Sequence, residues 1–180
     1  MIEQLWPYLK YFFGFIGVVA AVEIYLSSTW WPGYFMNGIP IYRRRLMVAP
    51  EVVEIPTSGE IEAALPDSGW STPMHVRLIG DNRFAFRETM CHFDLSYPPV
   101  MHGSFSYDRR TGEIKVRGFA NSYAALFTCF FILAPLALPL EPVDYIFPLF
   151  VLGLFIWIYR VQVKRYRQVE SAVQQVWPRG

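Results

Sequence analysis

The stretch GFIGVVAAVEIYLSSTWW, from Gly14 to Trp31, decides the fold that we expect of this chain. It is apolar apart from one carboxylate, Glu23. Together with the residues from about Pro7, it approaches the roughly 20 residues that a helix needs to cross about 30 Å of hydrocarbon. The preceding MIEQLWPYLK lacks the net positive charge of a secretory signal. The stretch therefore predicts a retained membrane-crossing helix.

The composition also favours a membrane protein. Of 180 residues, 53% are hydrophobic, 18% are aromatic and only 17% are charged, which is too apolar for an ordinary soluble domain of this size. Two further apolar stretches, about 119–138 and 145–161, are joined by LPLEPVD and predict a helical hairpin. Three membrane-crossing helices are the economical interpretation. The net charge of +1 gives no basic footprint for nucleic acid.

The cations are distributed unevenly along the chain. Ten of the sixteen Lys and Arg residues lie between the first and second apolar stretches, and five lie at the end of the third or beyond it, whereas Lys10 stands alone near the start of the first. Cations next to the ends of membrane helices are retained in the cytoplasm. We therefore expect a bacterial-type inner membrane protein with its N-terminus outside and its middle domain and C-terminus in the cytoplasm.

The segment between the first two apolar stretches predicts a small β domain. TSGE, at 57–60, fits a capping box that opens a short helix, which Pro66 closes. Period-two alternation in HVRLI, RFAFRE and MHGSFSY predicts strands, and SFSYDRRTGEIKVRGF predicts a hairpin whose turn ends at Gly112. We expect an antiparallel meander with one short helix. It resembles the small β-sheet domains, some of them pleckstrin-homology-like, that bacterial membrane proteins often carry, and the resemblance implies no site residues.

These observations predict an α+β integral membrane protein in four parts. They are an N-terminal transmembrane helix at 1–32, a cytoplasmic β-rich domain at 33–118, a transmembrane hairpin at 119–161 and an amphipathic juxtamembrane helix at 162–180. In the last part Val169, Val173, Val176 and Trp177 recur at helical spacing. This helix can continue the third crossing and then lie along the membrane surface or against the β domain.

Glu23 is the first candidate functional residue, because a carboxylate inside a membrane is costly unless it is paired or protonated. If the helix leaves the bilayer near Ser27, Glu23 lies about one turn inside the cytoplasmic boundary. The polar groups at the same boundary are Asn121, Ser122, Tyr123, Tyr159 and Arg160. We expect an interhelical clasp between Glu23 and Arg160 or Tyr123. A proton relay and a contact with a partner subunit remain alternatives.

The other candidates are possible metal ligands and clusters of cations. His75, Cys91, His92 and His102 are side chains that zinc and copper prefer. Cys91 and His92 are adjacent, however, and point to opposite faces of a strand. We therefore expect no metal and no cofactor, with Cys91 in the sheet core and the histidines at its edge or surface. The cations are expected to fix topology or to meet anionic headgroups or a phosphorylated ligand: Arg43, Arg44, Arg45, Lys164, Arg165 and Arg167.

The sequence contains no phosphate-binding glycine loop, no G-x-S-x-G elbow, no H-E-x-x-H and no CxxC. The favoured function is therefore a non-catalytic accessory, assembly or scaffold subunit. It would contact the lipid bilayer and either a membrane-protein partner or a second copy of the chain. Two alternatives are a small transporter or proton relay that uses Glu23 in an oligomer, and an enzyme built on the Cys/His set.

Overall fold

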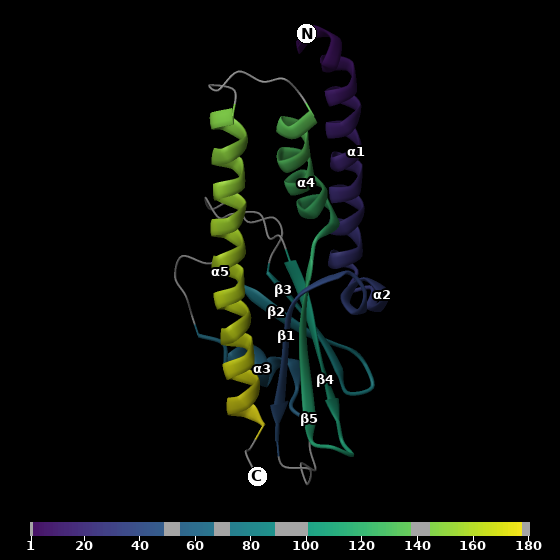
Figure 1. Cartoon of the computed structure of the whole chain (residues 1–180). Helices are drawn as coiled ribbons and strands as arrows, with labels where there is room; N and C mark the ends of the chain where they lie inside the picture. The colour runs from purple at the N-terminus through teal and green to yellow at the C-terminus, as the bar shows by residue number, and fades with distance from the viewer. Residues whose placement is uncertain (1, 49–54, 67–72, 89–100, 138–144, 178–180) are drawn as a thin grey trace.

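The computed structural model describes residues 2–48, 55–66, 73–88, 101–137 and 145–177. Three helices, α1 (Ile2–Ser28), α4 (Ser122–Ala137) and α5 (Ile146–Val176), lie beyond one end of a sheet, and α5 continues along the sheet (Figure 1). α4 packs between α1 and α5. Two short helices, α2 (Pro32–Met36) and α3 (Ser58–Ala63), lie against the sheet.

The sheet has five antiparallel strands in the order β1-β5-β4-β3-β2. They are β1 (Ile39–Met47), β2 (Met74–Gly80), β3 (Arg83–Glu88), β4 (Met101–Asp108) and β5 (Glu113–Ala120). Strands β2 to β5 form the predicted meander. β1 was not predicted, because three consecutive arginines hide the period-two pattern of IPIYRRRLM. It pairs with β5 and forms the edge strand on that side of the sheet.

The local predictions for the β domain are confirmed. The Thr57 hydroxyl accepts from the Glu60 backbone N–H at 3.3 Å, and the Glu60 carboxylate accepts from the Thr57 backbone N–H at 2.7 Å. This capping box opens α3. In the β4–β5 turn Gly112 has a φ of 64°, the left-handed conformation that glycine adopts without steric cost.

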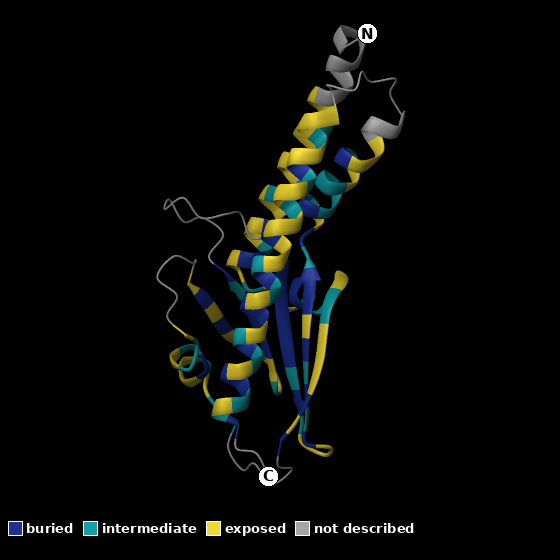
Figure 2. Cartoon of the chain, turned by 60° about the vertical axis from the view of Figure 1, so that its left-hand side comes forward, coloured by how far each residue is buried: buried dark blue, intermediate teal, exposed yellow. Residues whose placement is uncertain are grey.

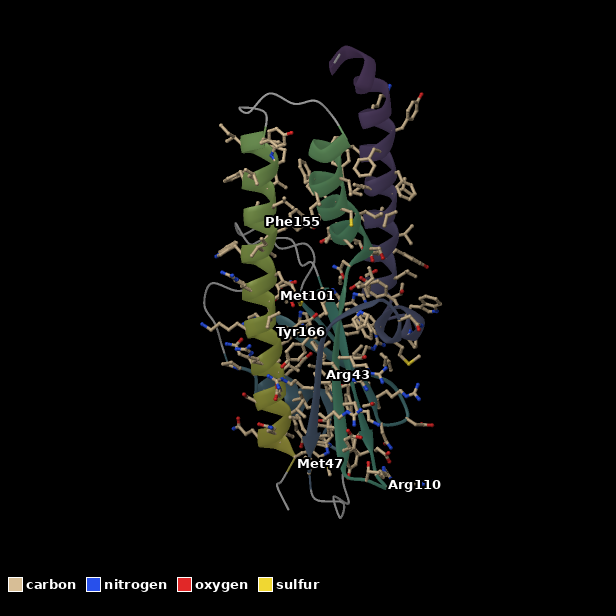
Figure 3. All side chains as sticks on the ribbon, viewed as in Figure 1. Arg43, Met47, Met101, Arg110, Phe155 and Tyr166 are labelled. Carbon is tan, nitrogen blue, oxygen red and sulfur yellow. The ribbon has the colours of Figure 1, made fainter. Side chains whose placement is uncertain are left out.

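The main hydrophobic core lies between the sheet and the second half of α5. Phe84, Phe86 and Phe105 on the strands pack with Tyr166 on α5 and with Trp177, which directly follows α5. All five side chains are buried, and Figure 2 shows the buried side of the sheet and helix. Figure 3 shows Tyr166 directed at the strands. α5 is one continuous helix of 31 residues, so the predicted division between 161 and 162 is not a break in the chain's secondary structure. Its polar half lies against the β domain, one of the two predicted positions.

Two glycines allow this close packing. A Cβ at Gly118 on β5 would overlap the Tyr166 ring, and a Cβ at Gly103 on β4 would overlap the Phe86 ring. Both aromatic rings therefore approach the backbone of a strand closely at a glycine, where any larger residue would displace them.

A buried polar cluster fastens α5 to β3. Arg165 Nε donates to Glu88 Oε1 at 3.3 Å, and Gln162 Nε2 donates to Glu88 Oε2 at 2.9 Å. All three side chains are buried. The sequence grouped Arg165 with the cations near lipid headgroups; its guanidinium instead lies inside the fold, because Glu88 faces the helix from the end of β3.

Two of the described helices are long and apolar enough to cross a membrane, α1 over Lys10–Ser28 and α5. The prediction of three crossings is not supported, because the described apolar run of α4, Ser122–Leu133, is shorter than the roughly 20 residues of a full crossing. The three helices expose large apolar side chains around their outer surfaces, whereas the strands are mostly buried on the α5 side (Figure 2).

Replacing Arg165 with Met tests the polar cluster. The change removes the guanidinium that pairs with the buried Glu88 carboxylate, so the free energy of unfolding of the protein in mild detergent should fall by about 3–5 kcal/mol. Arg167→Met is the matched control on the exposed face of the same helix and should change it by less than about 0.5 kcal/mol. Equal effects of the two variants would show that Arg165 contributes no more than a surface cation.

Candidate functional site

A second group of buried polar side chains lies where α1, α2, β4 and the start of α4 meet. We call Glu23, Tyr34, His102 and Asn121 the polar junction. All four are buried. They come from segments that are up to about a hundred residues apart in sequence, since hydrogen bonds link Glu23 with Ser122 and Tyr34 with Asn121. The junction therefore connects the apolar helices with the sheet.

Glu23 occupies the N-terminus of α4. Its Oε1 accepts from the backbone N–H of Ser122 at 2.7 Å, and its Oε2 accepts from the backbone N–H of Tyr123 at 3.1 Å. The first N–H groups of a helix have no partner within the helix and form the positive end of its dipole. A carboxylate supplied by α1 thus satisfies both the hydrogen bonds and the charge at the start of α4, and Glu23 is only 5% exposed.

These partners differ from the side chains that the sequence suggested for Glu23. Tyr123 is reached through its backbone N–H and not through its hydroxyl. Arg160 is exposed on α5, and no ion pair joins it to Glu23 in the part of the chain that the structure describes. The backbone amides are nearer because α4 packs between α1 and α5.

His102 is held between two oxygen atoms. Its Nδ1 lies 2.7 Å from Asn121 Oδ1, and its Nε2 lies 3.0 Å from the carbonyl oxygen of Tyr34. The imidazole also stacks on the Tyr34 ring with centroids 3.9 Å apart. The Tyr34 hydroxyl donates to Asn121 Oδ1 at 3.1 Å. The amide side chain of Asn121, the residue before α4, therefore contacts both β4 and α2.

Burial sets the protonation of these groups. It lowers the pKa of His102, and it raises the pKa of the Tyr34 hydroxyl far above its usual range. The neutral imidazole carries one N–H. If Nε2 donates to the Tyr34 carbonyl, Nδ1 needs a donor. The Asn121 amide supplies it when its NH₂ group takes the place of Oδ1, and the Tyr34 hydroxyl then accepts from that NH₂ group instead of donating to Oδ1. The junction is thus a buried hydrogen-bond network in which the His102 tautomer and the orientation of the Asn121 amide are coupled, and it requires no charge on His102.

The end of α1 is shaped to place α2 on the sheet. The N–H of Trp31 bonds to the carbonyl of Leu26 and that of Trp30 bonds to the carbonyl of Ser27, which is a Schellman motif. Trp30 has a φ of 55°, a conformation that costs a side-chain-bearing residue about 1–2 kcal/mol. Its ring stacks on Phe35 at 5.4 Å and lies 4.8 Å from the Arg87 guanidinium carbon. These contacts offset the cost.

The four predicted metal-ligand candidates do not form a group in the described residues. Cys91 and His92 lie outside them. His75 is exposed on β2, 3.8 Å from Glu62, whereas His102 is buried in the polar junction. The expectation that the histidines lie at the edge or surface is therefore wrong for His102, which the α2 aromatic residues cover. No group of three or more metal-binding side chains occurs among the residues described.

The predicted cation clusters have separate environments. Arg43, Arg44 and Arg45 are exposed along β1, and Arg45 Nε lies 3.3 Å from Glu113. Neighbouring side chains on a strand point to opposite faces, so Arg44 is separated from Arg43 and Arg45. Lys164 and Arg167 are exposed on α5. A role for these residues in lipid contact or topology stays a prediction.

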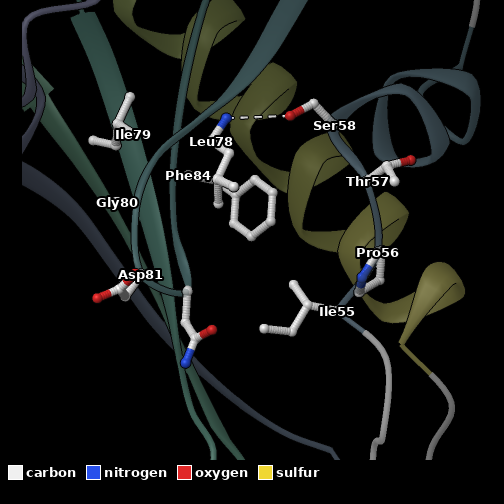
Figure 4. Close-up of a pocket in the computed structure, with 10 residues that line it drawn as sticks. Ile55, Pro56, Thr57, Ser58, Leu78, Ile79, Gly80, Asp81 and Phe84 are labelled. Atoms are coloured by element: carbon white, nitrogen blue, oxygen red, sulfur yellow. Dashed lines mark hydrogen bonds between the residues drawn. The ribbon is translucent and has the colours of Figure 1, made fainter.

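A pocket of about 800 Å³ lies beside β2 and the start of α3 (Figure 4). Ile55, Leu78 and Phe84 contribute apolar lining, and Asp81 contributes a carboxylate. The β2 edge next to it is already occupied: Ser58 accepts from the Leu78 N–H at 3.2 Å, and Glu62 accepts from the Val76 N–H at 2.6 Å. α3 thus protects an edge that could otherwise add a further strand.

No family model, curated protein or solved structure matches this chain.

The polar junction could be predicted only in part from the sequence. Glu23 stood out as a charge in an apolar run, and Asn121 as a polar residue at the start of another. Tyr34 gave no signal, because an aromatic residue after a membrane helix is ordinary.

Substitutions at Glu23 test its role as the cap of α4. Glu23→Leu leaves two partly buried N–H groups without the acceptor that they have now and should lower the free energy of unfolding by about 2 kcal/mol. Glu23→Gln retains one acceptor oxygen but turns an NH₂ group toward the other N–H, so an intermediate loss of about 1 kcal/mol is expected. Unfolding of the detergent-solubilised protein measures both.

Arg160→Leu is the control for this series, and we expect it to change stability little. A loss as large as that of Glu23→Leu would show that the carboxylate depends on an ion pair with Arg160 and not on the helix N-terminus.

Proposed function

We propose that this chain is a non-catalytic integral membrane protein of a bacterial-type inner membrane, an accessory, assembly or scaffold subunit that presents its β domain at a fixed orientation to a larger complex. The observation that carries the proposal is the polar junction. Its polar atoms bind one another and the backbone of α2 and α4, so they hold the helices to the sheet. This is the arrangement expected of a structural connection between a membrane anchor and a domain.

We further propose that α1 crosses the membrane and that α4 and α5 enter it as a hairpin. The support is the apolar exposed surface that these helices share. On α1 and α5 it includes Tyr11, Phe13, Phe15, Val18, Val22, Ile24, Tyr25, Ile146, Phe147, Leu149, Phe150, Leu154, Ile156 and Trp157. Soluble monomers seldom expose apolar patches of this extent. The N-terminus then lies outside, with the β domain and C-terminus in the cytoplasm.

The geometry of Glu23 favours this role over a transporter or proton relay. Both of its carboxylate oxygens accept backbone N–H bonds, and the side chain is buried. A relay residue must exchange protons with neighbours along a path, whereas release of either bond here would expose the N-terminus of α4. The alternative that used Glu23 in an oligomer therefore loses its main support.

The surface proposed for the partner is an apolar groove of about 500 Å³ between α4 and α5. Ala124, Ala125, Thr128 and Cys129 line its α4 side, and Phe155 and Ile156 line its α5 side (Figure 3 labels Phe155). Small residues allow the backbone of another helix to approach closely within a membrane. We propose that a transmembrane helix of the partner protein occupies the groove.

A reporter that is active only in the periplasm tests the topology. Fused after Gly180, it should stay inactive, because fifteen of the sixteen cations lie on the side of the β domain and C-terminus. The same reporter fused before Met1 is the positive control. Activity of the C-terminal fusion would reverse the orientation.

Purification in mild detergent with mass spectrometry of bound proteins tests the partner. Wild type should retain a stoichiometric membrane-protein partner, and Ala125→Phe should lose it because the new ring fills the groove. Val18→Phe is the matched control on the exposed surface of α1 and should retain the partner. A wild-type protein that purifies only as a homo-oligomer, or an equal loss in both variants, would contradict the proposal.

A further inference from the structure

The face of the sheet that points away from α5 is basic. Near the apolar helices it is covered by α2, where Tyr34 and Phe35 pack with Ala85. Beyond α2 the strands present alternate side chains to this face. Among these are Arg83 on β3, Lys115 and Arg117 on β5, and Arg43 and Arg45 on β1.

The strand register brings these cations into two rows. In one row Arg83 lies opposite Ser106, Ser106 opposite Lys115, and Lys115 opposite Arg45. In the next row Ser104 lies opposite Arg117, and Arg117 opposite Arg43. Adjacent strands are about 4.8 Å apart. Ser106 on β4 is thus flanked by a cation on both sides, whereas Ser104 has Arg117 on its β5 side and Ala85 on its β3 side.

Like charges that lie directly opposite each other in a sheet are destabilising. Glu113 partly offsets one row, because it lies 3.3 Å from Arg45 Nε and 3.1 Å from Lys115 Nζ. For Arg43, Arg83 and Arg117, no ion pair occurs within the described ranges of the chain. The repulsion between Arg117 and Arg43 is therefore not offset by a carboxylate there, and an anion would relieve it.

A pocket of about 180 Å³ lies at this place. Arg83, Ser104, Ser106, Lys115 and Arg117 line it, together with Met36 at the end of α2. Arg83 Nη1 lies 3.1 Å from the Met36 sulfur, which positions the guanidinium at the rim. In the described residues no hydrogen bond engages the hydroxyl of Ser104 or Ser106, although Ser104 is only 9% exposed. The pocket thus offers two hydroxyl donors between three cationic groups.

We propose that this pocket binds a phosphate group. A phosphate monoester carries up to two negative charges and has oxygens that match the paired N–H groups of a guanidinium. Arg83 would bind it from β3 and Arg117 from β5, with the two serine hydroxyls donating from β4 below. Lys115 adds a further positive charge, which Glu113 partly neutralises. The volume suits a small anionic group and not a large apolar ligand.

Two sources can supply the phosphate, a lipid headgroup or a soluble phosphate compound. The headgroup is within reach if the membrane boundary lies at the end of α1, because the short helix α2 separates that boundary from the pocket, and Met36 at the end of α2 lines the pocket. The experiment must therefore offer both sources to the full-length protein.

The probes are inorganic phosphate, added to the protein in neutral detergent at constant ionic strength set by chloride, and phosphatidic acid, supplied in nanodiscs of equimolar phosphatidylcholine and phosphatidic acid. Nanodiscs of phosphatidylcholine alone are the reference. The thermal midpoint Tm is the measurement, because a ligand that binds the native state raises it. We expect at least one probe to raise Tm.

Arg83→Gln and Arg117→Gln should each weaken the apparent affinity for the effective probe at least about tenfold, since each removes a charge-assisted hydrogen bond. Without phosphate, Arg117→Gln should not lower Tm, because it relieves repulsion with Arg43. Arg110→Gln is the matched control: Arg110 is exposed in the β4–β5 turn at the far end of the sheet (Figure 3) and should leave binding unchanged.

A response to inorganic phosphate assigns the site to a soluble phosphate compound, and a response to the phosphatidic acid nanodiscs alone assigns it to a headgroup. Absence of any response to both probes overturns the proposal. So does an equal loss of affinity in Arg110→Gln, which would indicate diffuse attraction of anions to a basic domain and no defined pocket.

Discussion

The carboxylate of Glu23 at the N-terminus of α4 is the interaction on which the arrangement of the helices depends. A helix that starts at the end of a strand leaves its first N–H groups without partners. Here β5 ends at Ala120 and α4 begins at Ser122, so the sheet itself has no further strand to supply them. α1 supplies the acceptor from a buried position. The placement of the first helix is thereby tied to the point where the chain passes from β5 into α4.

A second buried carboxylate, that of Glu88, holds α5 against the sheet. α5 is apolar in its first half and carries polar residues in its second, yet its inward stripe continues through Tyr166, Val169 and Val173. Glu88 accepts from Gln162 and Arg165 inside this contact. A buried carboxylate that binds two donors fixes the helix along its length and around its axis. The β domain is therefore attached to the apolar helices at two separate places.

The two faces of the sheet are consequently used differently. One face forms the core with α5, and the other is covered by α2 only near the helices and is basic beyond it. Cations on an open face cost stability when they lie opposite one another. Among the described residues, these cations lie next to two serine hydroxyls that make no hydrogen bond. This favours an anionic ligand over the purely topological role that the sequence suggested for the arginines of β1.

The sequence by itself determined the apolar helices, the β2–β5 meander, the capping box of α3 and the turn at Gly112. These features follow from composition, periodicity and backbone geometry within a few residues. Only the tertiary structure decided that β1 joins the sheet, that Glu23 caps α4, that His102 is buried and that Arg165 pairs with Glu88. Each depends on residues dozens to about a hundred positions apart, and no local pattern specifies which distant group will meet a buried charge.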